Sequence, residues 1–358
     1  EDITFYRQGE FVDLCAGPHL PDTGRVRAFR LLSITGAYWR GDSSKRMLQR
    51  IYGVAFPKAG QLEEHLVRLE EAKKRDHNKL GRELEYFTTV DYIGQGLPIL
   101  MPKGARVIQI LQRFVEDEEQ KRGYLLTKTP FMAKSDLYKI SGHWDHYREN
   151  MYFTKIDEQD YAVKPMNCPA HCLLYKRETR SYRDLPLRYA EYGPLSRFEL
   201  SGTLHGLLRV RGFHQDDAHL FVREDQIEEE IGNVLAIIDE IYSTFGMSYK
   251  IKLSTRPEDF MGEIETWNRA EAALARALER HNLPYTLNEG DGAFYGPKLD
   301  FDVTDALGRS WQCATVQLDF QFPDRFDLTY VDQDGREKRP VMIHRAILGT
   351  IERFIGII

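Results

Sequence analysis

Residues 187–222 read LRYAEYGPLSRFELSGTLHGLLRVRGFHQDDAHLFV, and two parts of this stretch have the composition of β-strands. The first covers residues 187–192 and the second covers residues 207–222, both with apolar residues in alternation. Between them lies a polar loop with Gly202 and Gly206, a residue type that turns favour. The sequence therefore predicts a long β-hairpin.

The second predicted strand carries most of its polar side chains on one face, because successive side chains of a strand point to opposite sides. The odd positions hold Arg209, Arg211, Phe213, Gln215, Asp217, His219 and Phe221. The even positions are mostly apolar, except for His214 and Asp216. A solvated strand face would explain any one of these polar residues. Their combination favours a nucleotide site, because guanidinium groups match phosphate oxygens and an aromatic ring can stack on a purine.

The composition indicates a soluble globular protein with one large or two moderate domains. The 358 residues are 42% hydrophobic and 29% charged, with a net charge of −6. This balance excludes a global basic field, so any contact with RNA would depend on local patches. No apolar run approaches the ~20 residues of a membrane span, and no signal peptide opens the sequence. The four scattered cysteines favour a reducing cytoplasm over a disulfide framework.

Apolar periodicity predicts the other elements of the chain. A hairpin followed by a helix is expected within residues 31–57, with a Gly-Asp-Ser turn at 41–43, and a charged linker helix is expected at 60–86. Further helices are predicted at 105–122, 227–245 and 267–281, and further strands at 124–130, 249–254, within 289–302 and at 311–320. The last stretch, 341–358, is predicted as a strand that runs into a helix.

Some cysteine and histidine pairs have spacings that occur in metal sites. Cys15 and His19 are one such pair, but Gly17-Pro18 between them favours a turn, and a structural zinc site needs four ligands.

Cys168 and Cys172, with His171 between them, look like half of a metal knuckle, but no second pair follows at zinc-finger spacing. From the pattern alone, Cys168 is therefore a buried core thiol. His143 and His146 have i, i+3 spacing, and an exposed loop surface is the simpler interpretation of both.

Three motifs give the chain a resemblance to a known family. Arg197-Phe198-Glu199, a loop, and Arg-Val-Arg-Gly-Phe at 209–213 resemble motif 2 of the class II aminoacyl-tRNA synthetases. Gln-Asp-Asp-Ala-His at 215–219 is similar to the threonyl-tRNA synthetases in particular. A helix, a strand and Pro130 resemble motif 1, and Gly349 with Arg353 resembles motif 3.

The resemblance implies an α+β fold, in which a mainly antiparallel sheet is flanked by helices. It implies the C-terminal part of an editing domain at 1–57, a linker helix at 58–86 and a class II catalytic domain at 87–358. Only the Cys15 and His19 half of the editing signature is present, so these residues are expected to be remnants without editing activity. An anticodon-binding domain is expected beyond Ile358, and a homodimer is expected through the motif 1 region.

The resemblance also implies roles for individual residues. The zinc ligands are expected to be Cys168, His219 and His344. The catalytic residues are expected to be Arg197, Gln215, Lys298 and Arg353. ATP, with Mg²⁺ on its phosphates, is expected to contact Arg197, Glu199, Arg209, Phe213, Gln312 and Arg353. L-threonine is expected to contact Met166, Gln215, Asp217, Tyr295 and Gln317. His143 is expected near the end of the tRNA. Because Gln312 and Gln317 have opposite parity, a bulge or a strand end is expected between them.

The implied activity is that of a cytoplasmic threonine–tRNA ligase, which makes threonyl-adenylate from L-threonine and ATP and charges the 3′ end of tRNA(Thr). Three protein ligands and one open side suit a functional zinc ion. A metal that requires a hydroxyl ligand would reject valine, which an apolar pocket separates poorly from threonine, but would reject serine by only ~1–3 kcal/mol. The alternatives are an inactive synthetase-like module, a zinc-dependent hydrolase and an RNA-binding fragment without chemistry.

Overall fold

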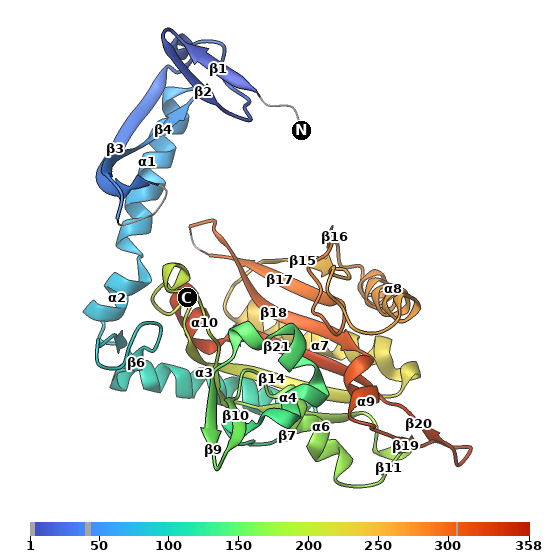
Figure 1. The fold of residues 1–358 in the computed structure, drawn as a ribbon. Coiled ribbons are helices and arrows are strands. Elements are labelled where there is room, and N and C mark those ends of the chain that lie inside the picture. The colour runs from blue at the N-terminus through green and yellow to red at the C-terminus, as the bar shows by residue number, and fades with distance from the viewer. Residues whose placement is uncertain (1–3, 40–43, 306) are drawn as a thin grey trace. The chain divides into compact units, whose positions relative to one another are not determined.

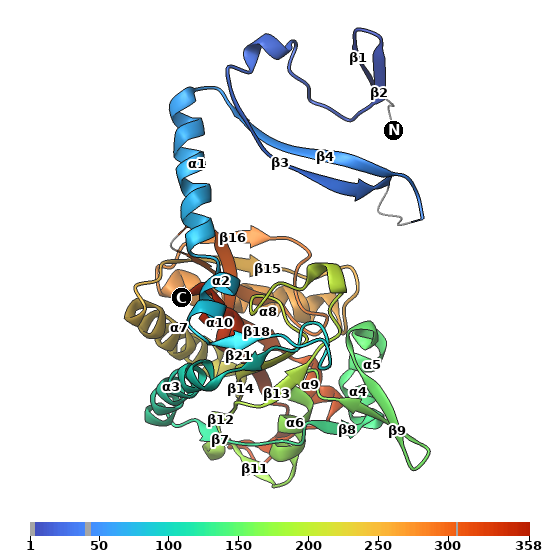
Figure 2. The same cartoon turned by 90° about the vertical axis from the view of Figure 1, so that its left-hand side faces the viewer.

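The computed structural model describes residues 4–39, 44–305 and 307–358, and its ribbon is drawn from two sides in Figures 1 and 2. The chain divides into two compact units, residues 1–75 and residues 76–358.

The first unit contains two hairpins and a helix. Strands β1 (Phe5–Gln8) and β2 (Phe11–Leu14) pair antiparallel, as do β3 (Ala28–Tyr38) and β4 (Met47–Phe56). Helix α1 (Ala59–Lys74) follows and packs on β3 and β4. The hairpin predicted within 31–57 is confirmed, although the helix after it begins only at Ala59. The predicted turn at 41–43 lies outside the described residues.

The predicted linker helix is divided into two helices. Helix α1 ends at Lys74, and α2 spans His77–Glu83 in the second unit. Asp76, between them, has an extended backbone, and its carboxylate accepts a hydrogen bond of 2.9 Å from the amide of Lys79. The break is explained by this cap, because the first amides of a helix lack partners within it and aspartate supplies one.

The second unit is built on a nine-stranded sheet. Its strands run in the order β16 (Tyr285–Asn288), β15 (Tyr249–Ser254), β17 (Lys298–Thr304), β18 (Ser310–Asp319), β21 (Val341–Thr350), β14 (Gly212–Val222), β12 (Leu187–Glu191) and β7 (Leu125–Leu126), with β13 (Pro194–Ser196) paired to β14. The pairs are antiparallel except for β15 with β16 and β12 with β7. The predicted fold class is confirmed.

Helices bury the apolar side of this sheet. Helices α7 (Ile227–Thr244) and α8 (Ile264–Arg280) pack on the central strands, and α10 (Ile351–Ile357) packs on β14, β21 and α3 (Pro102–Lys121). In α8 the buried residues recur at three and four positions, which is the spacing of one helix face: Trp267, Ala270, Ala273, Leu274, Ala277 and Leu278. All of these positions except Trp267 form the apolar face expected for the predicted helix 267–281, and the observed helix begins three residues earlier, at Ile264.

Shorter elements complete the second unit. The helices are α4 (Ser135–Ser141), α5 (His143–His146), α6 (Cys168–Lys176) and α9 (Gln321–Arg325). The remaining strands are β5 (Phe87–Thr88), β6 (Ile99–Leu100), β8 (Met132–Lys134), β9 (Phe153–Ile156), β10 (Gln159–Val163), β11 (Arg180–Ser181), β19 (Tyr330–Val331) and β20 (Glu337–Lys338). Among the described residues, no helix combines the length and apolar character needed to cross a membrane.

The predicted hairpin is present, but its second strand is shorter than expected. Leu187 lies opposite Phe221 and Glu191 opposite Asp217. The second strand begins at Gly212 instead of residue 207, because residues 205–209 close a turn of their own through backbone hydrogen bonds between His205 and Arg209. The predicted strand 124–130 is likewise reduced to Leu125–Leu126, at the edge of the sheet.

Strand pairing is irregular at two places in the sheet. In β18, Gln312 lies opposite Asp302 and Thr315 opposite Asp300, so β18 has one residue more than β17 between these pairs. Because of this extra residue, Gln312 and Gln317 can face the same side of the sheet although their positions have opposite parity. The bulge or strand end expected between them is therefore present as a bulge. In β14 the register also shifts between Gln215 and Asp217.

Candidate active site

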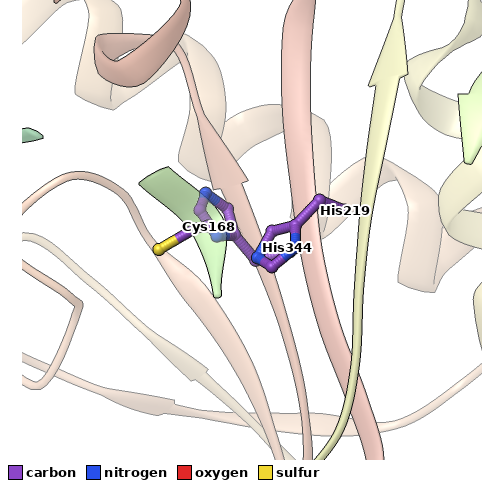
Figure 3. A group of neighbouring side chains, drawn as sticks. All are labelled: Cys168, His219 and His344. Atoms are coloured by element: carbon purple, nitrogen blue, oxygen red, sulfur yellow. The ribbon is translucent and has the colours of Figure 1, made fainter. Parts of the chain in front are cut away.

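Three side chains from distant parts of the chain meet on the sheet. Cys168 is the first residue of α6, His219 lies on β14, and His344 lies directly opposite His219 on β21. One ligand atom from each lies within 4.8 Å of the other two, and all three residues are buried. Figure 3 shows the three side chains together. A cysteine and two histidines are the donor set of zinc and related metals.

Each histidine of this cluster is held by a partner at one ring nitrogen. His219 Nδ1 lies 2.7 Å from His171 Nδ1, and His171 Nε2 lies 3.1 Å from a carboxylate oxygen of Glu191. His344 Nε2 lies 2.9 Å from a carboxylate oxygen of Asp319. The other ring nitrogen of each, Nε2 of His219 and Nδ1 of His344, is not engaged in these bonds. Partners of this kind orient metal-binding histidines in proteins.

Burial favours the neutral form of two of the three groups, Cys168 and His219. It raises the pKa of the Cys168 thiol well above its usual value, and the nearby Asp217 carboxylate acts in the same direction. Burial also lowers the pKa of His219 well below its usual value. Neutral imidazoles have the lone pair that a metal needs, and a bound cation would favour the thiolate form of Cys168.

The cluster forms one wall of a cavity of about 220 Å³. The lining residues are Met166, Cys168, Arg197, Gln215, Asp217, His219, Tyr295, Lys298, Gln312, Thr315, Gln317, His344, Arg345 and Ala346. Eleven of these residues are among the site residues predicted from the sequence: Met166, Cys168, Arg197, Gln215, Asp217, His219, Tyr295, Lys298, Gln312, Gln317 and His344. The structure thus brings together most of the predicted set.

The part of the cavity next to the cluster is rich in hydrogen-bonding groups. The Tyr295 hydroxyl donates a hydrogen bond to Gln317 Oε1, and its ring stacks on His344 with centroids 4.8 Å apart. Asp217 accepts a hydrogen bond of 2.9 Å from Asn167 Nδ2. A small ligand with an amino group and a hydroxyl would find acceptors there.

A second part of the cavity is cationic. Arg197 donates a 3.1 Å hydrogen bond to the carbonyl of Pro165, and its guanidinium lies 5.0 Å from the centre of the Phe213 ring. Lys298 pairs with Asp300 at 3.1 Å. Gln312 donates to the same carboxylate at 2.5 Å. These groups offer fixed donors for an anionic ligand.

Four predicted ATP contacts lie outside the cavity lining. Phe213 lies beneath Arg197, and Glu199 forms an ion pair with Arg209 at 2.9 Å. Arg353 donates to the carbonyls of Leu208 and Gln312, each at 3.0 Å, so it lies beside a lining residue. Burial lowers the pKa of Arg353 from its usual value, and the positive charge of nearby Arg209 acts in the same direction.

The prediction that His143 is exposed is wrong. Its side chain is buried, with Nδ1 at 2.7 Å from Ser141 Oγ and Nε2 at 3.0 Å from Met166 Sδ. Burial lowers its pKa to about 3. His143 has no exposed surface through which to contact tRNA, and instead it supports Met166 in the cavity wall. Its burial comes from aromatic rings of distant segments, such as Phe294 and Phe322.

The other predicted pair lies in the first unit. His19 Nε2 is 2.9 Å from Cys15 Sγ, and the His19 ring stacks on Tyr6 with centroids 3.9 Å apart. The two residues are joined by an irregular segment and not by a helix, as Gly17-Pro18 predicted.

Four residues that form hydrogen bonds around the Cys/His/His cluster and Asp217 were not predicted from the sequence. These are Asn167, His171, Glu191 and Asp319. His171 was visible beside Cys168 in the sequence, but nothing there indicated that its ring would contact His219. Asp319 shares the parity of Gln317 in its strand, which was a usable signal for a residue near the site.

Comparisons with known proteins agree with this arrangement. Residues 152–358 match the tRNA synthetase class II core domain (G, H, P, S and T), and residues 3–52 match the threonyl and alanyl tRNA synthetase second additional domain. The chain is 63% identical to the threonine–tRNA ligase of Symbiobacterium thermophilum over its whole length, which is 55% of that relative. It is 57% identical to threonine–tRNA ligase 2 of Bacillus subtilis, covering 56% of it. The chain thus spans about half the length of the curated relatives it matches.

Solved structures give the same result. The RNA binding domain of threonyl-tRNA synthetase from Cryptosporidium parvum aligns with a TM-score of 0.77 and 44% identity, over 79% of this chain and 71% of that one. Prolyl-tRNA synthetase from Giardia lamblia shares the fold, with a TM-score of 0.62 and 18% identity, over 80% of this chain and 52% of that one. The chain therefore belongs to the class II tRNA synthetases, and within them to the threonyl-tRNA synthetase family.

Proposed function

We propose that the protein is a threonine–tRNA ligase, which activates L-threonine with ATP and transfers it to the 3′ end of tRNA(Thr). One observation carries this proposal: a single cavity joins a Cys/His/His cluster and hydrogen-bonding groups on one side to fixed cations on the other. The first side suits a small amino acid with a hydroxyl group. The second side suits the phosphates of a nucleotide.

The metal that fits this site is zinc, held by Cys168, His219 and His344. The fit rests on the sulfur and nitrogen donor set, on the burial of all three groups and on their position in a cavity wall, which leaves room for a substrate ligand. When bound there, zinc would supply a Lewis acid that accepts the amino group and the hydroxyl of threonine.

The chain's own residues would hold threonine beside the metal. The Asp217 carboxylate would accept the hydrogen bond of the substrate hydroxyl, and Asn167 holds that carboxylate in place at 2.9 Å. Gln215, Tyr295 and Gln317 would enclose the rest of the amino acid, and Met166 would close the wall. This arrangement positions the substrate carboxylate for reaction, which is a large part of catalysis when no protein nucleophile is needed.

The cationic part of the cavity would hold ATP. A threonine carboxylate oxygen would attack the α-phosphorus in line, the bond to the β-phosphate oxygen would break, and pyrophosphate would leave with Mg²⁺ on its oxygens. Arg197 would stabilise the negative charge that develops on the α-phosphate, with Lys298 and Gln312 nearby.

The groups beside the cavity would bind the two ends of ATP. Phe213 would stack on adenine and Glu199 would accept a hydrogen bond from its amino group. Arg209 and Arg353 would hold the γ-phosphate. Glu199 and Arg209 pair with each other in this structure, so ATP would replace that ion pair with its own contacts.

Selectivity would follow from the metal and Asp217. Valine has the shape of threonine but no hydroxyl, so it would leave the metal and Asp217 without their ligand. Serine keeps the hydroxyl and lacks one methyl group. The missing methyl group is worth only about 1–3 kcal/mol, which is a roughly 10- to 200-fold difference in kcat/KM. We therefore expect measurable activation of serine and none of valine.

A cytoplasmic homodimer is part of the proposal. The edge strand β7 leaves Leu125 and Leu126 more than half exposed, at 51% and 56%, and Phe131, five residues further along the chain, is 61% exposed. An apolar sheet edge of this kind is suited to pairing with a second copy. All four cysteines are free, which fits a reducing compartment.

The test combines metal analysis with pyrophosphate exchange. Cys168→Ala is expected to lose bound zinc and threonine-dependent exchange. Cys172→Ala, a buried thiol on the same helix, serves as the matched control and is expected to keep both. Unchanged zinc content in Cys168→Ala would contradict the ligand assignment, and strong exchange with valine would contradict the role of the hydroxyl. A wild-type chain that binds zinc but exchanges nothing would be an inactive module.

A further inference from the structure

Helix α2 contacts the loop that carries the proposed ATP-binding arginine Arg209. The loop comprises residues 199–211, and α2 spans His77–Glu83. Both belong to the second compact unit. His77, the first residue of α2, is half-buried, and none of the roles proposed above involves it.

The turn at 205–209 satisfies most of its own amide groups. The amides of Leu208 and Arg209 donate to the carbonyl of His205 at 2.8 and 3.2 Å, and the amide of His205 donates to Arg209 at 3.1 Å. The amide of Leu207 instead donates to Nε2 of His77 at 3.2 Å. Leu207 is only 2% exposed, so loss of this acceptor would leave a buried amide unpaired.

The turn and helix α2 are in close contact at Gly206. Its backbone has φ +48°, and a Cβ atom there would lie 2.1 Å from His77 Nε2 and 2.2 Å from Asn78 Oδ1. Only glycine allows this approach. The His205 ring also packs edge-on against the His77 ring, with centroids 5.0 Å apart.

The same turn holds groups of the proposed active site. The carbonyl of Leu208, the residue after Leu207, accepts a 3.0 Å hydrogen bond from Arg353 Nε. Arg209, the next residue, pairs with Glu199. A displacement of the turn would therefore move an acceptor of Arg353 and the backbone of Arg209 together.

We infer that His77 is a positioning residue for ATP binding, because its ring fixes the Leu207 amide and with it the turn that carries Arg209 and orients Arg353. This inference rests on the proposed function, since it assigns the two arginines to ATP. It extends the ATP site to a helix that the sequence assigned to a linker.

Asp76, His77 and His205 also have ligand atoms close enough for a metal ion, all within 4.8 Å of one another. Two of these three residues already accept hydrogen bonds from backbone amides of the protein. Asp76 accepts a hydrogen bond from the Lys79 amide at 2.9 Å, and His77 Nε2 accepts from Leu207. The contacts therefore favour positioning over metal binding. The burial of His77, which lowers its pKa, agrees with a neutral ring that accepts at Nε2.

The test compares three variants of the whole chain by pyrophosphate exchange and by hydrogen exchange of the Leu207 amide. His77→Leu removes the acceptor, and His77→Gln restores one through its amide oxygen. Lys79→Ala changes an exposed side chain of the same helix and is the control. Loss of one hydrogen bond is worth ~1 kcal/mol, or about five-fold, so we expect His77→Leu to raise the KM for ATP and the amide exchange rate by about that factor.

The KM for threonine, the zinc content and the Tm are expected to stay near wild-type values in His77→Leu, and His77→Gln is expected to recover most of the ATP effect. Equal KM for ATP and equal protection of the Leu207 amide in wild type and His77→Leu would overturn the inference. If the wild-type chain shows no pyrophosphate exchange, the proposed function fails, and amide protection still decides whether His77 holds the turn.

Discussion

The imidazole of His171 lies 2.7 Å, nitrogen to nitrogen, from that of His219, with the two ring planes at 82°. His171 in turn contacts Glu191, which accepts a 2.8 Å hydrogen bond from the buried Lys164. A metal ion at Nε2 of His219 would leave the proton on Nδ1, so His219 would donate to His171 and His171 would donate to Glu191. One chain of hydrogen bonds thus fixes the tautomer of a proposed metal ligand.

Replacing His171 is therefore expected to weaken zinc binding without removing a ligand. We predict that His171→Leu reduces zinc affinity by about 10- to 100-fold, as loss of such orienting partners does in other metal sites. Competition with a chromogenic chelator would measure the affinity. His281→Leu, at an exposed histidine, is the control. Equal zinc affinities for wild type and His171→Leu would show that His219 is oriented without its neighbour.

Asp217 is expected to act on threonine and not on ATP. In Asp217→Asn, the charged acceptor for the substrate hydroxyl is replaced by a neutral amide, and a hydrogen bond to a charged group is worth roughly 1.5–3 kcal/mol. We predict that kcat/KM for threonine falls by roughly 10- to 100-fold while the KM for ATP changes by less than about three-fold. Pyrophosphate exchange with each substrate varied in turn gives both values. If Asp217→Asn instead impaired only the use of ATP, Asp217 would act in the ATP half of the cavity and the prediction would be wrong.

Gly349, at the start of the motif 3 resemblance, is expected to tolerate no side chain. Its φ is +76°, and a Cβ there would lie 2.6 Å from the backbone oxygen of Cys313 on the neighbouring strand. Gly246 has a similar φ of +64° but no atom within 4 Å of such a Cβ. We predict that Gly246→Ala lowers the free energy of unfolding by ~1–2 kcal/mol through backbone strain alone, and that Gly349→Ala costs at least ~1 kcal/mol more through the collision.

Urea unfolding of both glycine variants tests this pair. Equal losses in the two would mean that β18 and β21 can separate locally at no cost, which is contrary to close packing of the sheet.

The pair between His214 and Glu352 predicts a pH-dependent stability. His214 Nδ1 lies 2.9 Å from the buried carboxylate of Glu352, and this hydrogen bond raises the pKa of His214, with the charge of Glu352 acting in the same direction against burial. Because the pKa is higher in the folded state, the stabilisation is complete below the unfolded value of about 6.5 and is lost as the pH rises through the folded pKa. The Tm difference between wild type and His214→Ala should therefore be larger near pH 6 than near pH 8.5.

The same comparison in a Glu352→Gln background is the control, because without the carboxylate the difference should no longer be larger at the lower pH. A pH-independent difference in the native background would mean that the protonated pair contributes nothing.

Local patterns in the sequence predicted much of this fold. The helix face of α8 and the strand 249–254 follow from periods of 3.6 and 2, which depend only on the chain's own geometry. The opposite parity of Gln312 and Gln317 even indicated the irregularity in β18. The cluster of Cys168 with two histidines could not be derived in this way, because it depends on pairing between strands that are far apart in the sequence.

The errors have the same origin. Gly-His-Trp at 142–144 looks like a polar loop, yet rings from residues beyond 290 bury His143. The linker at 60–86 has one continuous pattern of leucines and charges, so the capping role of Asp76 was hidden within it. In both cases a contact that is remote or specific to one side chain overrode the local pattern.

The break at Asp76 has a practical consequence for anyone who wants to engineer a minimal version of this protein. A protein shortened to begin at Phe87, where the sequence suggests that the catalytic part starts, would discard α2 and leave the Leu207 amide without its acceptor. One that begins at Asp76 would retain the cap, the helix and the contact. The two truncations differ only by residues 76–86, so comparing their yield and their affinity for ATP would show how much of the proposed nucleotide site depends on a segment that carries none of its proposed ligands.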